Sequence, residues 1–258
     1  SYMRVYEAPS ADNHQLTGGN SYVDRAFYYD AKGRLIQTVE AGSDGWRSRY
    51  STSYDFVGNI VATLESHTPP QGSEDVLLTR YSYDQRGRML SSVVTLNGQR
   101  QSEVMYSYDE LGRPNGREFL DSDGNTLASE SVGFNLQGWR TGTSVAYDGM
   151  PVFGELLCHY DPMMGVPQYS GMISEISYGH GDMMDMQSYS YDYDGLGRLS
   201  SSAHFINGSL VDENFETGFR YDRNGNLLAL QRYGIAANPF THDYLADDLS
   251  YAYDGNRL

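Results

Sequence analysis

The sequence repeats one short motif, Tyr-Asp-x-x-Gly followed by Arg or Asn, and directly successive copies lie 25 to 32 residues apart. Its Tyr, Asp and Gly positions are Tyr29, Asp30, Gly33, Tyr54, Asp55, Gly58, Tyr83, Asp84, Gly87, Tyr108, Asp109, Gly112, Tyr193, Asp194, Gly197, Tyr221, Asp222 and Gly225. Residues 134–139 form a degenerate copy and residues 253–258 a shortened one. A fixed period of this length indicates a repeat architecture, so the repeat constrains the fold more than any other feature.

Each motif residue has a turn-forming property. Asp at the start of a type I turn accepts backbone N–H groups, and Gly at the fourth position adopts the left-handed conformation that closes a hairpin. Second turns are expected at Asn97-Gly98, Asp123-Gly124 and Asn207-Gly208. A repeat of this length therefore predicts a strand–turn–strand–turn unit, and we expect the motif residues to be structural repeat turns.

Aromatic residues support this interpretation. Many motif copies carry a second aromatic residue two positions before the motif Tyr, as at Tyr81 and Tyr106, which places both rings on one face of a strand. The chain has 39% hydrophobic residues, and 23 of its 258 residues are Tyr, so Tyr must supply much of the packed surface. The sequence predicts an all-β fold of tandem β-hairpins in one long antiparallel sheet, with residues 1–258 as a single domain.

Residues 144–189 interrupt the rhythm. Residues 153–160 fit a short helical pattern and an alternating strand pattern equally well, but Pro151 and Pro162 bracket them too closely for a stable helix, so a strand is expected. Residues 169–178 are expected to form another strand. The methionines of this section, at 163, 164, 172, 183, 184 and 186, either fill gaps in the packing or form an adaptable binding surface, and gap-filling is favoured.

The charge disfavours several partners. The formal net charge is −16, and Lys32 is the only lysine. Such a field repels phosphate backbones and anionic lipid, so we expect no nucleic-acid partner. No apolar run reaches the roughly 18 to 20 residues of a membrane helix, and the first residues lack a signal-peptide pattern, so no membrane insertion is expected. A leader already removed would leave the same pattern.

The recurring Tyr-Asp-x-x-Gly-Arg-Leu pattern resembles the YD repeats of the rearrangement-hotspot (Rhs) family, which toxin-complex shells and teneurins share. The resemblance covers about residues 20–258. It implies hairpins wound into a curved sheet that forms part of a hollow shell, which in bacterial members commonly encloses a C-terminal toxin. Residues 167–176 also resemble a segment of long secreted bacterial proteins of this type, so a secreted or cell-surface location is expected.

The chain departs from the family pattern in three ways. It has too few copies to enclose a cargo, and it lacks a toxin domain. It also lacks the paired Asp-Pro sites of the family's self-cleaving segment, since Asp161-Pro162 stands alone. We therefore expect an excerpt of a larger protein. Its expected partners are the remainder of the parent chain or other repeat segments, which would pair with open sheet edges near Val5 or Tyr251.

No catalytic, cofactor or metal site is expected. Paired acids such as Asp192 and Asp194 lie in expected turns, where capping explains them. Residues 121–125 resemble the start of a calcium loop, but the twelfth position is Val132 instead of Glu, so a hairpin turn is the better interpretation. The six His residues show no metal-ligand spacing. Cys158, the only cysteine, is expected to be a buried thiol and not a nucleophile activated by His159.

The leading hypothesis is a structural module of a secreted or cell-surface shell or scaffold. The alternative is a carbohydrate- or protein-binding surface that uses exposed Tyr ladders, with a glycan or protein as ligand. An enzyme that uses paired Asp residues is a distant third. The motif Arg is expected to pair either with its own motif Asp or with an acid of a neighbouring repeat.

Overall fold

The computed structural model describes residues 1–6, 22–181, 186–234 and 244–255, and the chain divides into two compact units, 1–127 and 128–258. The first unit contains β1 (Tyr2–Tyr6), β2 (Tyr22–Tyr29), β3 (Leu35–Gly42), β4 (Arg47–Tyr54), β5 (Ile60–Thr68), β6 (Asp75–Tyr83), β7 (Met89–Leu96), β8 (Gln99–Tyr108) and β9 (Pro114–Leu120). The second contains most of β10 (Thr126–Phe134), then β11 (Arg140–Tyr147), β12 (Met150–Cys158), β13 (Glu175–His180), β14 (Gln187–Tyr193), β15 (Leu199–Ile206), β16 (Ser209–Tyr221), β17 (Leu227–Gly234) and β18 (Tyr244–Ser250).

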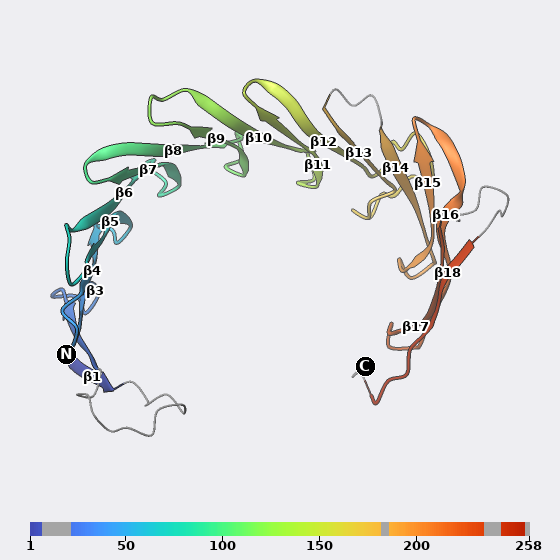
Figure 1. Cartoon of the computed structure of the whole chain (residues 1–258). Coiled ribbons are helices and arrows are strands. Elements are labelled where there is room, and N and C mark those ends of the chain that lie inside the picture. The colour runs from blue at the N-terminus through green and yellow to red at the C-terminus, as the bar shows by residue number, and fades with distance from the viewer. Residues whose placement is uncertain (7–21, 182–185, 235–243, 256–258) are drawn as a thin grey trace. The chain divides into compact units, whose positions relative to one another are not determined.

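Every strand pairs antiparallel with the strand that precedes or follows it in the chain. This pairing runs from β1 to β9 in the first unit and from β10 to β18 in the second (Figure 1). The described residues contain no helix, and so none that could cross a membrane. The expected all-β fold of tandem hairpins in a long antiparallel sheet is confirmed.

Turns of several lengths join the strands, and the motif turns are one recurring kind. The motif turns join β2 to β3, β4 to β5, β6 to β7, β8 to β9, β14 to β15 and β16 to β17. In each unit they all lie on the same side, at the ends of the strands. At the opposite ends of the strands lie two-residue turns and also longer connections, such as residues 43–46, 69–74 and 121–125. Asn97 and Gly98 have φ of 51° and 82°, and Asn207 and Gly208 have 50° and 78°, as the tight hairpin turn that matches strand twist requires.

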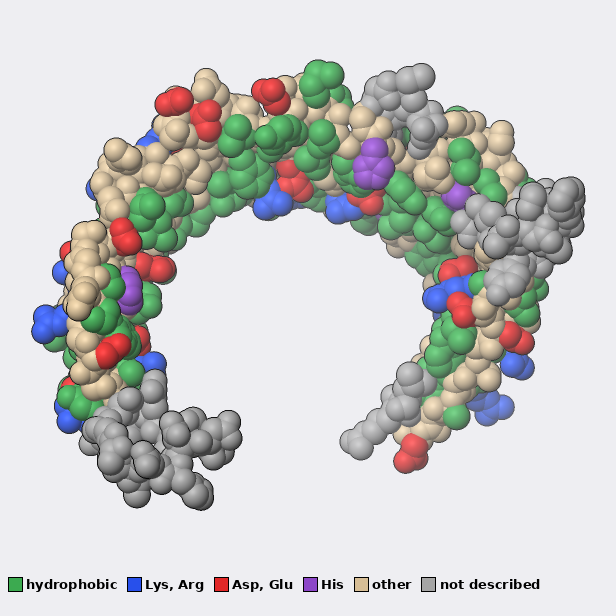
Figure 2. All heavy atoms as spheres, viewed as in Figure 1, with side chains coloured by type: hydrophobic (Ala, Val, Ile, Leu, Met, Phe, Trp, Pro, Cys, Tyr) green, Lys and Arg blue, Asp and Glu red, His purple; other side chains and the backbone are tan. Residues whose placement is uncertain are grey.

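Few hydrophobic side chains are buried in the described part of the chain, and all of them lie in the second unit. Among the described residues only Leu157, Ala229 and Leu230 are buried hydrophobic side chains. Figure 2 shows hydrophobic side chains in runs across the strands of each unit, with acidic and basic side chains among them. Because so few apolar groups are buried, contacts between side chains on adjacent strands must carry much of the stability.

Ring ladders supply such contacts in the second unit. Phe215 and Tyr233, which are directly paired across β16 and β17, stack with centroids 4.5 Å apart and planes at 10°. Tyr189 and His204 stack at 4.5 Å and 18° across β14 and β15. Aromatic pairs of this geometry add stability beyond their buried area.

The section that interrupts the repeat contains more regular structure than the sequence indicates. β12 confirms the expected strand for residues 153–158, and a tight turn at Asp148 and Gly149 precedes it. The strand expected at residues 169–178 is correct only from Glu175 onward, because residues 159–174 form a connection without strands. Ser174, which is 0% exposed, ends this connection and donates its hydroxyl toward the carbonyl oxygens of Cys158 and His159.

Candidate functional site

The motif turn is built around its Asp carboxylate. Asp30 Oδ1 accepts the backbone N–H of Lys32 at 2.8 Å and of Arg34 at 2.9 Å, while Oδ2 accepts Arg34 Nε at 2.7 Å. Gly33 N donates to the carbonyl of Asp30 at 3.0 Å, and its φ is 78°. One carboxylate thus satisfies two backbone donors and holds the guanidinium that follows the Gly.

The other motif copies reproduce this turn. The Arg pairs with its own motif Asp at Arg88–Asp84, Arg113–Asp109 and Arg198–Asp194, which decides between the two partners expected for it. Where Asn replaces Arg, the Asn side-chain amide donates to the same carboxylate, at 2.8 Å for both Asn59–Asp55 and Asn226–Asp222. Both residue types at this position therefore donate to the Asp.

Motif tyrosines connect each hairpin to the one before it. Tyr108 lies at the end of β8, and its hydroxyl donates to the carbonyl oxygen of Met89, at the start of the neighbouring β7, over 2.8 Å. Met89 is the residue directly after the motif Arg of the preceding copy. The same bond joins Tyr54 to Leu35, Tyr83 to Ile60 and Tyr221 to Leu199. We call this bond the Tyr latch.

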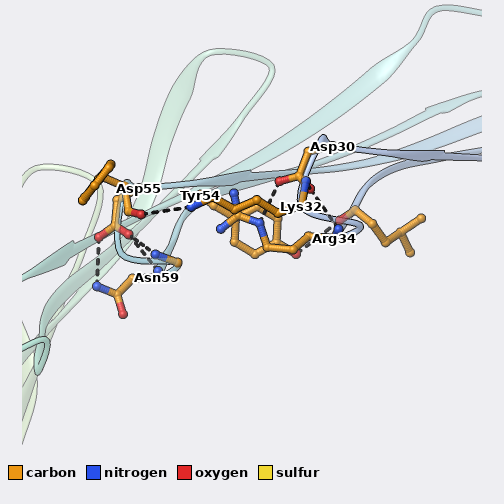
Figure 3. A network of polar contacts seen from close by, with 9 residues as sticks. Asp30, Lys32, Arg34, Tyr54, Asp55 and Asn59 are labelled. Carbon is orange, nitrogen blue, oxygen red and sulfur yellow. Dashed lines mark hydrogen bonds and ion pairs between the residues drawn. The ribbon is translucent and has the colours of Figure 1, made fainter.

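Where the preceding copy has Arg, its guanidinium lies over the ring of the latched Tyr. Figure 3 shows Arg34 beside the Tyr54 ring. Arg34 Cζ is 4.3 Å from the centroid of that ring, and Arg88 Cζ is 4.5 Å from that of Tyr108. Arg198 is 4.6 Å from Tyr221. These are cation–π distances, so each such Arg joins its own Asp to the next hairpin's ring.

Three copies depart from the pattern. Tyr29 belongs to the first copy and is 53% exposed. The hydroxyl of Tyr193 donates to Ile173 at 2.7 Å, so residue 173 of the irregular connection takes the place of the usual acceptor. In the degenerate copy Asn135 replaces Asp, and its Oδ1 accepts the N–H of Trp139 at 2.9 Å. Of the shortened last copy, residues 256–258 lie outside the described residues.

The turns favour ionised carboxylates. Hydrogen bonds from the backbone N–H and side chain of Arg34 hold the pKa of Asp30 below its ordinary value of 3.8. The backbone N–H of Arg88 is the main cause of the lowered pKa of Asp84, and the side chain of Arg198 is the main cause at Asp194. The motif Asp residues therefore carry full negative charge at neutral pH.

The second unit also contains a shallow pocket of about 520 Å³ on one face of its sheet. We call it the aromatic pocket. It spans β12 to β16 and is lined by Phe153, Glu155, Ile176, Tyr178, Tyr189, Tyr191, Ser202, Phe215 and Glu216. Strand register brings these residues together, because Glu155 is paired with Tyr178, Ile176 with Tyr189, and Ser202 with Glu216.

The two carboxylates of the pocket each have an arginine partner. Glu155 forms an ion pair with Arg140, and Glu216 accepts Arg232 Nε at 2.9 Å. Both Arg side chains are nearly half exposed, whereas the Glu155 side chain is 20% exposed. Burial raises the pKa of Tyr191 to about 12, so its hydroxyl stays protonated at neutral pH.

The remaining candidate residues do not form a reactive cluster. Cys158 is half-buried instead of buried, because it lies on the strand face opposite the buried Leu157, and burial raises the pKa of its thiol. Both ring nitrogens of His159 face carbonyl oxygens, of Met172 at 2.9 Å and Arg140 at 3.1 Å, so this imidazole is engaged away from the thiol.

The acids expected in turns are found there or at the sheet surface. Asp192 is exposed and accepts Ser201 Oγ at 3.1 Å, whereas Asp194 caps its turn. Residues 121–125 form a hairpin turn in which Asp121 Oδ1 accepts the N–H of Asp123 and Asn125, which confirms the turn interpretation. No group of three or more His, Cys, Asp or Glu side chains suited to a metal occurs in the described part of the chain.

The methionines of the irregular section differ in their surroundings, and gap-filling does not describe all of them. Met172 fills a gap, since its Sδ would lie 3.2 Å from a Cβ added at Gly197. Met163 is 79% exposed, so the gap-filling expectation is wrong for that residue. Met183 and Met184 lie outside the described residues.

Sequence reasoning missed both the Tyr latch and the aromatic pocket. The recurrence of an aliphatic residue directly after the motif Arg or Asn could have signalled the latch, although its separation from the next motif Tyr varies between 19 and 23 residues. The pocket offers no such signal, because its residues come from five strands spread over residues 153–216.

Comparisons with known proteins give structural similarities only, since no family model and no curated protein matches the chain. The Tc holotoxin pore of Photorhabdus luminescens is 14% identical over 91% of this chain and 13% of that chain, with a TM-score of 0.43. The TcdB2–TccC3 complex without its hypervariable C-terminal region is 13% identical over 91% of this chain and 15% of that chain, with a TM-score of 0.40. A porin-like protein from Bacteroides uniformis is 11% identical over 82% of this chain and 93% of that chain, with a TM-score of 0.31. The chain thus spans about one seventh of the length of the first two.

Proposed function

We propose that this chain is a structural YD-repeat module that forms part of a secreted or cell-surface bacterial shell or scaffold. The Tyr latch carries the proposal, because it repeats from hairpin to hairpin and uses the motif residues to join repeats. A side chain that bonds a neighbouring hairpin's backbone and lies under its guanidinium is already occupied, so it has a structural role. In a shell, the parent protein could enclose a C-terminal toxin or effector.

In this proposal the motif residues stabilise the contacts between neighbouring repeats. Stability of such an array is a sum of the stability of each repeat and of the contacts between neighbours. The Tyr latch and the Arg–ring contact are such neighbour contacts. The remainder of a parent chain, or other repeat segments, would then be the natural partners.

Measuring where the natural protein is located, and whether it forms a protease-resistant assembly, tests the proposal. Antibodies against the chain should label intact producing cells or detect a protease-resistant assembly in the medium. Replacing Tyr83, Tyr108 and Tyr221 together with Phe should make that assembly protease-sensitive without removing the rings. A protein confined to the cell interior, or an assembly indifferent to the three changes, would contradict the proposal.

A carbohydrate-binding Tyr ladder receives less support. A sugar stacks on an open aromatic face, but the guanidinium of Arg34, Arg88 or Arg198 already lies over one face of a motif ring. A glycan array on the intact chain decides this alternative. Binding that disappears when the exposed Tyr29 or Tyr50 is replaced with Leu would support it.

A further inference from the structure

The aromatic pocket has a composition that its place in a repeat sheet does not require. Five of its nine lining residues are aromatic, at Phe153, Tyr178, Tyr189, Tyr191 and Phe215. Its volume of about 520 Å³ is that of a small-molecule site, since such sites measure roughly 300–1,000 Å³. None of the six turn motifs contributes a Tyr, Asp or Gly to it, so the hairpin turns do not explain it.

The charge of the lining is of one sign. Glu155 and Glu216 are its only charged residues, and the lining contains no Lys or Arg. Their Arg partners lie outside the lining, with side chains 47% and 48% exposed, and exposed ion pairs contribute little. A ligand cation can therefore replace Arg140 or Arg232 at small cost. An anionic ligand would meet two carboxylates, and the lining itself offers it no Lys or Arg.

The surroundings keep other positive charge away from the rings. His204 lies under Tyr189 with its Nε2 2.6 Å from Gln187 Oε1, and burial lowers the pKa of this imidazole. It is therefore neutral at pH 7 and does not repel a bound cation. Tyr191 contributes a ring whose hydroxyl remains protonated.

The hydrogen-bonding groups further narrow the ligand class. Ionised carboxylates only accept hydrogen bonds, and the side-chain donors of the lining are the hydroxyls of Tyr178, Tyr189, Tyr191 and Ser202. Ser202 Oγ already accepts the N–H of Glu216 at 3.2 Å. A ligand N–H or O–H can donate to these carboxylates, and a positive charge on the ligand adds an attraction to them that a neutral polyol lacks.

We propose that the aromatic pocket binds an organic ammonium group, held by cation–π contacts to its rings and by the carboxylates of Glu155 and Glu216. Aromatic rings with nearby carboxylates are the chemistry that recognises quaternary and methylated ammonium ions. The group could belong to a free small molecule or to a modified lysine of another protein. This inference is independent of the structural role proposed for the turns.

A matched pair of ligands tests the charge directly. Choline and 3,3-dimethylbutan-1-ol have the same shape, but only choline is charged. Calorimetric titration of the intact chain should give about tenfold weaker binding for the neutral alcohol. Equal affinity for the two would overturn the proposal, because the pocket would then select apolar shape alone. Adding Nε-trimethyllysine amide tells whether an amino-acid source of the group is accepted as well as a free one.

Substitutions of the two pocket carboxylates test whether choline binds in the aromatic pocket. Glu155→Gln and Glu216→Gln should each weaken choline binding by about threefold or more. Glu103→Gln is the matched control, since Glu103 is also 20% exposed and paired with an arginine, Arg100, but lies in the first unit. An equal loss in the control would show diffuse attraction to a chain of net charge −16 and would overturn the proposal.

A measurement on the unaltered chain covers the case in which a variant fails to fold. Choline should shift the aromatic NMR resonances of Tyr189 and Tyr191, and leave those of Tyr50 in the first unit unchanged. Saturating choline without shifts at the two pocket residues would overturn the proposal.

Discussion

The hydroxyl of Tyr108 donates a 2.8 Å hydrogen bond to the carbonyl oxygen of Met89, and the guanidinium next to Met89, that of Arg88, lies 4.5 Å from the Tyr108 ring. Consecutive motif copies are thereby joined by two contacts of one side chain, the hydrogen bond of its hydroxyl and the cation–π contact of its ring. The hydroxyl bond and the ring contact can be removed separately, which makes their contributions measurable.

We expect Tyr108→Phe to lower the free energy of unfolding by about 1 kcal/mol, the usual net contribution of one hydrogen bond. The Phe ring keeps the contact with Arg88, so the change isolates the hydroxyl. Urea denaturation followed by circular dichroism measures it. Tyr29→Phe is the control, because Tyr29 is 53% exposed in the first copy. Equal losses in the two variants would show that the bond to Met89 contributes nothing.

The Gly position of the motif should be restricted by backbone conformation alone. Gly87 has a φ of 78°, and a Cβ added there would meet no atom within 4 Å. Gly87→Ala should therefore cost ~1–2 kcal/mol through the left-handed backbone, and Gly87→Asn less, since Asn adopts that conformation more readily.

Gly195→Ala provides the comparison for Gly87. Gly195 also has open space around it, but it is not among the glycines with positive φ. We expect the thermal midpoint of this variant to stay at or slightly above the parent value, because Ala restricts the unfolded chain. A loss as large as that of Gly87→Ala would mean that crowding, and not φ, sets the preference.

The motif turns could be predicted from the sequence because their chemistry is local. Asp30, Gly33 and Arg34 contact one another within five residues, so their types and order are enough to specify the turn. The same reasoning succeeds at Asn97-Gly98. The Tyr latch escaped prediction because its acceptor is a backbone carbonyl, which any residue offers, and its partner is 19 residues away in the case of Tyr108.

The aromatic pocket and the connection at residues 159–174 lie beyond such reasoning. Whether Glu155 faces Tyr178 depends on the register of β12 against β13, and this register is set after a 16-residue connection that departs from the regular motif. The buried Glu175 illustrates the same limit. Its carboxylate is 3% exposed and accepts the N–H of Met164 at 2.7 Å, a contact that only the folded connection creates.

Acidification should destabilise the repeat through its motif carboxylates. The fold lowers the pKa of Asp84 from 3.8, chiefly through the backbone N–H of Arg88. A lowered pKa means that the stabilising contribution is complete above about pH 4 and is lost as the pH falls through the folded-state value. The contribution of the motif carboxylates to the thermal unfolding midpoint should therefore be constant from pH 7 to about pH 5. It should decrease when the pH is lowered below 4.

Asp84→Asn should weaken this acid response. The Asn135 turn shows that an amide oxygen can accept the backbone N–H in this position, so the variant keeps a cap but has no charge to lose. Asp192→Asn, at an exposed acid outside the turns, should leave the response unchanged. An unaltered acid transition in the Asp84→Asn variant would exclude that carboxylate as a contributor.

A second pH response is expected nearer neutrality, from His204. This imidazole is 4% exposed, stacks on Tyr189 at 4.5 Å, and has its pKa lowered by burial from 6.5. The unfolded chain therefore binds the proton more readily than the folded one. Stability should fall as the pH drops below about 6.5 and stop falling once the pH passes the folded-state pKa. Urea midpoints at pH 7.5, 6.5 and 5.5 measure the effect. His204→Gln should remove this component while the exposed His180→Gln keeps it, and the prediction fails if both variants retain the parent's pH dependence.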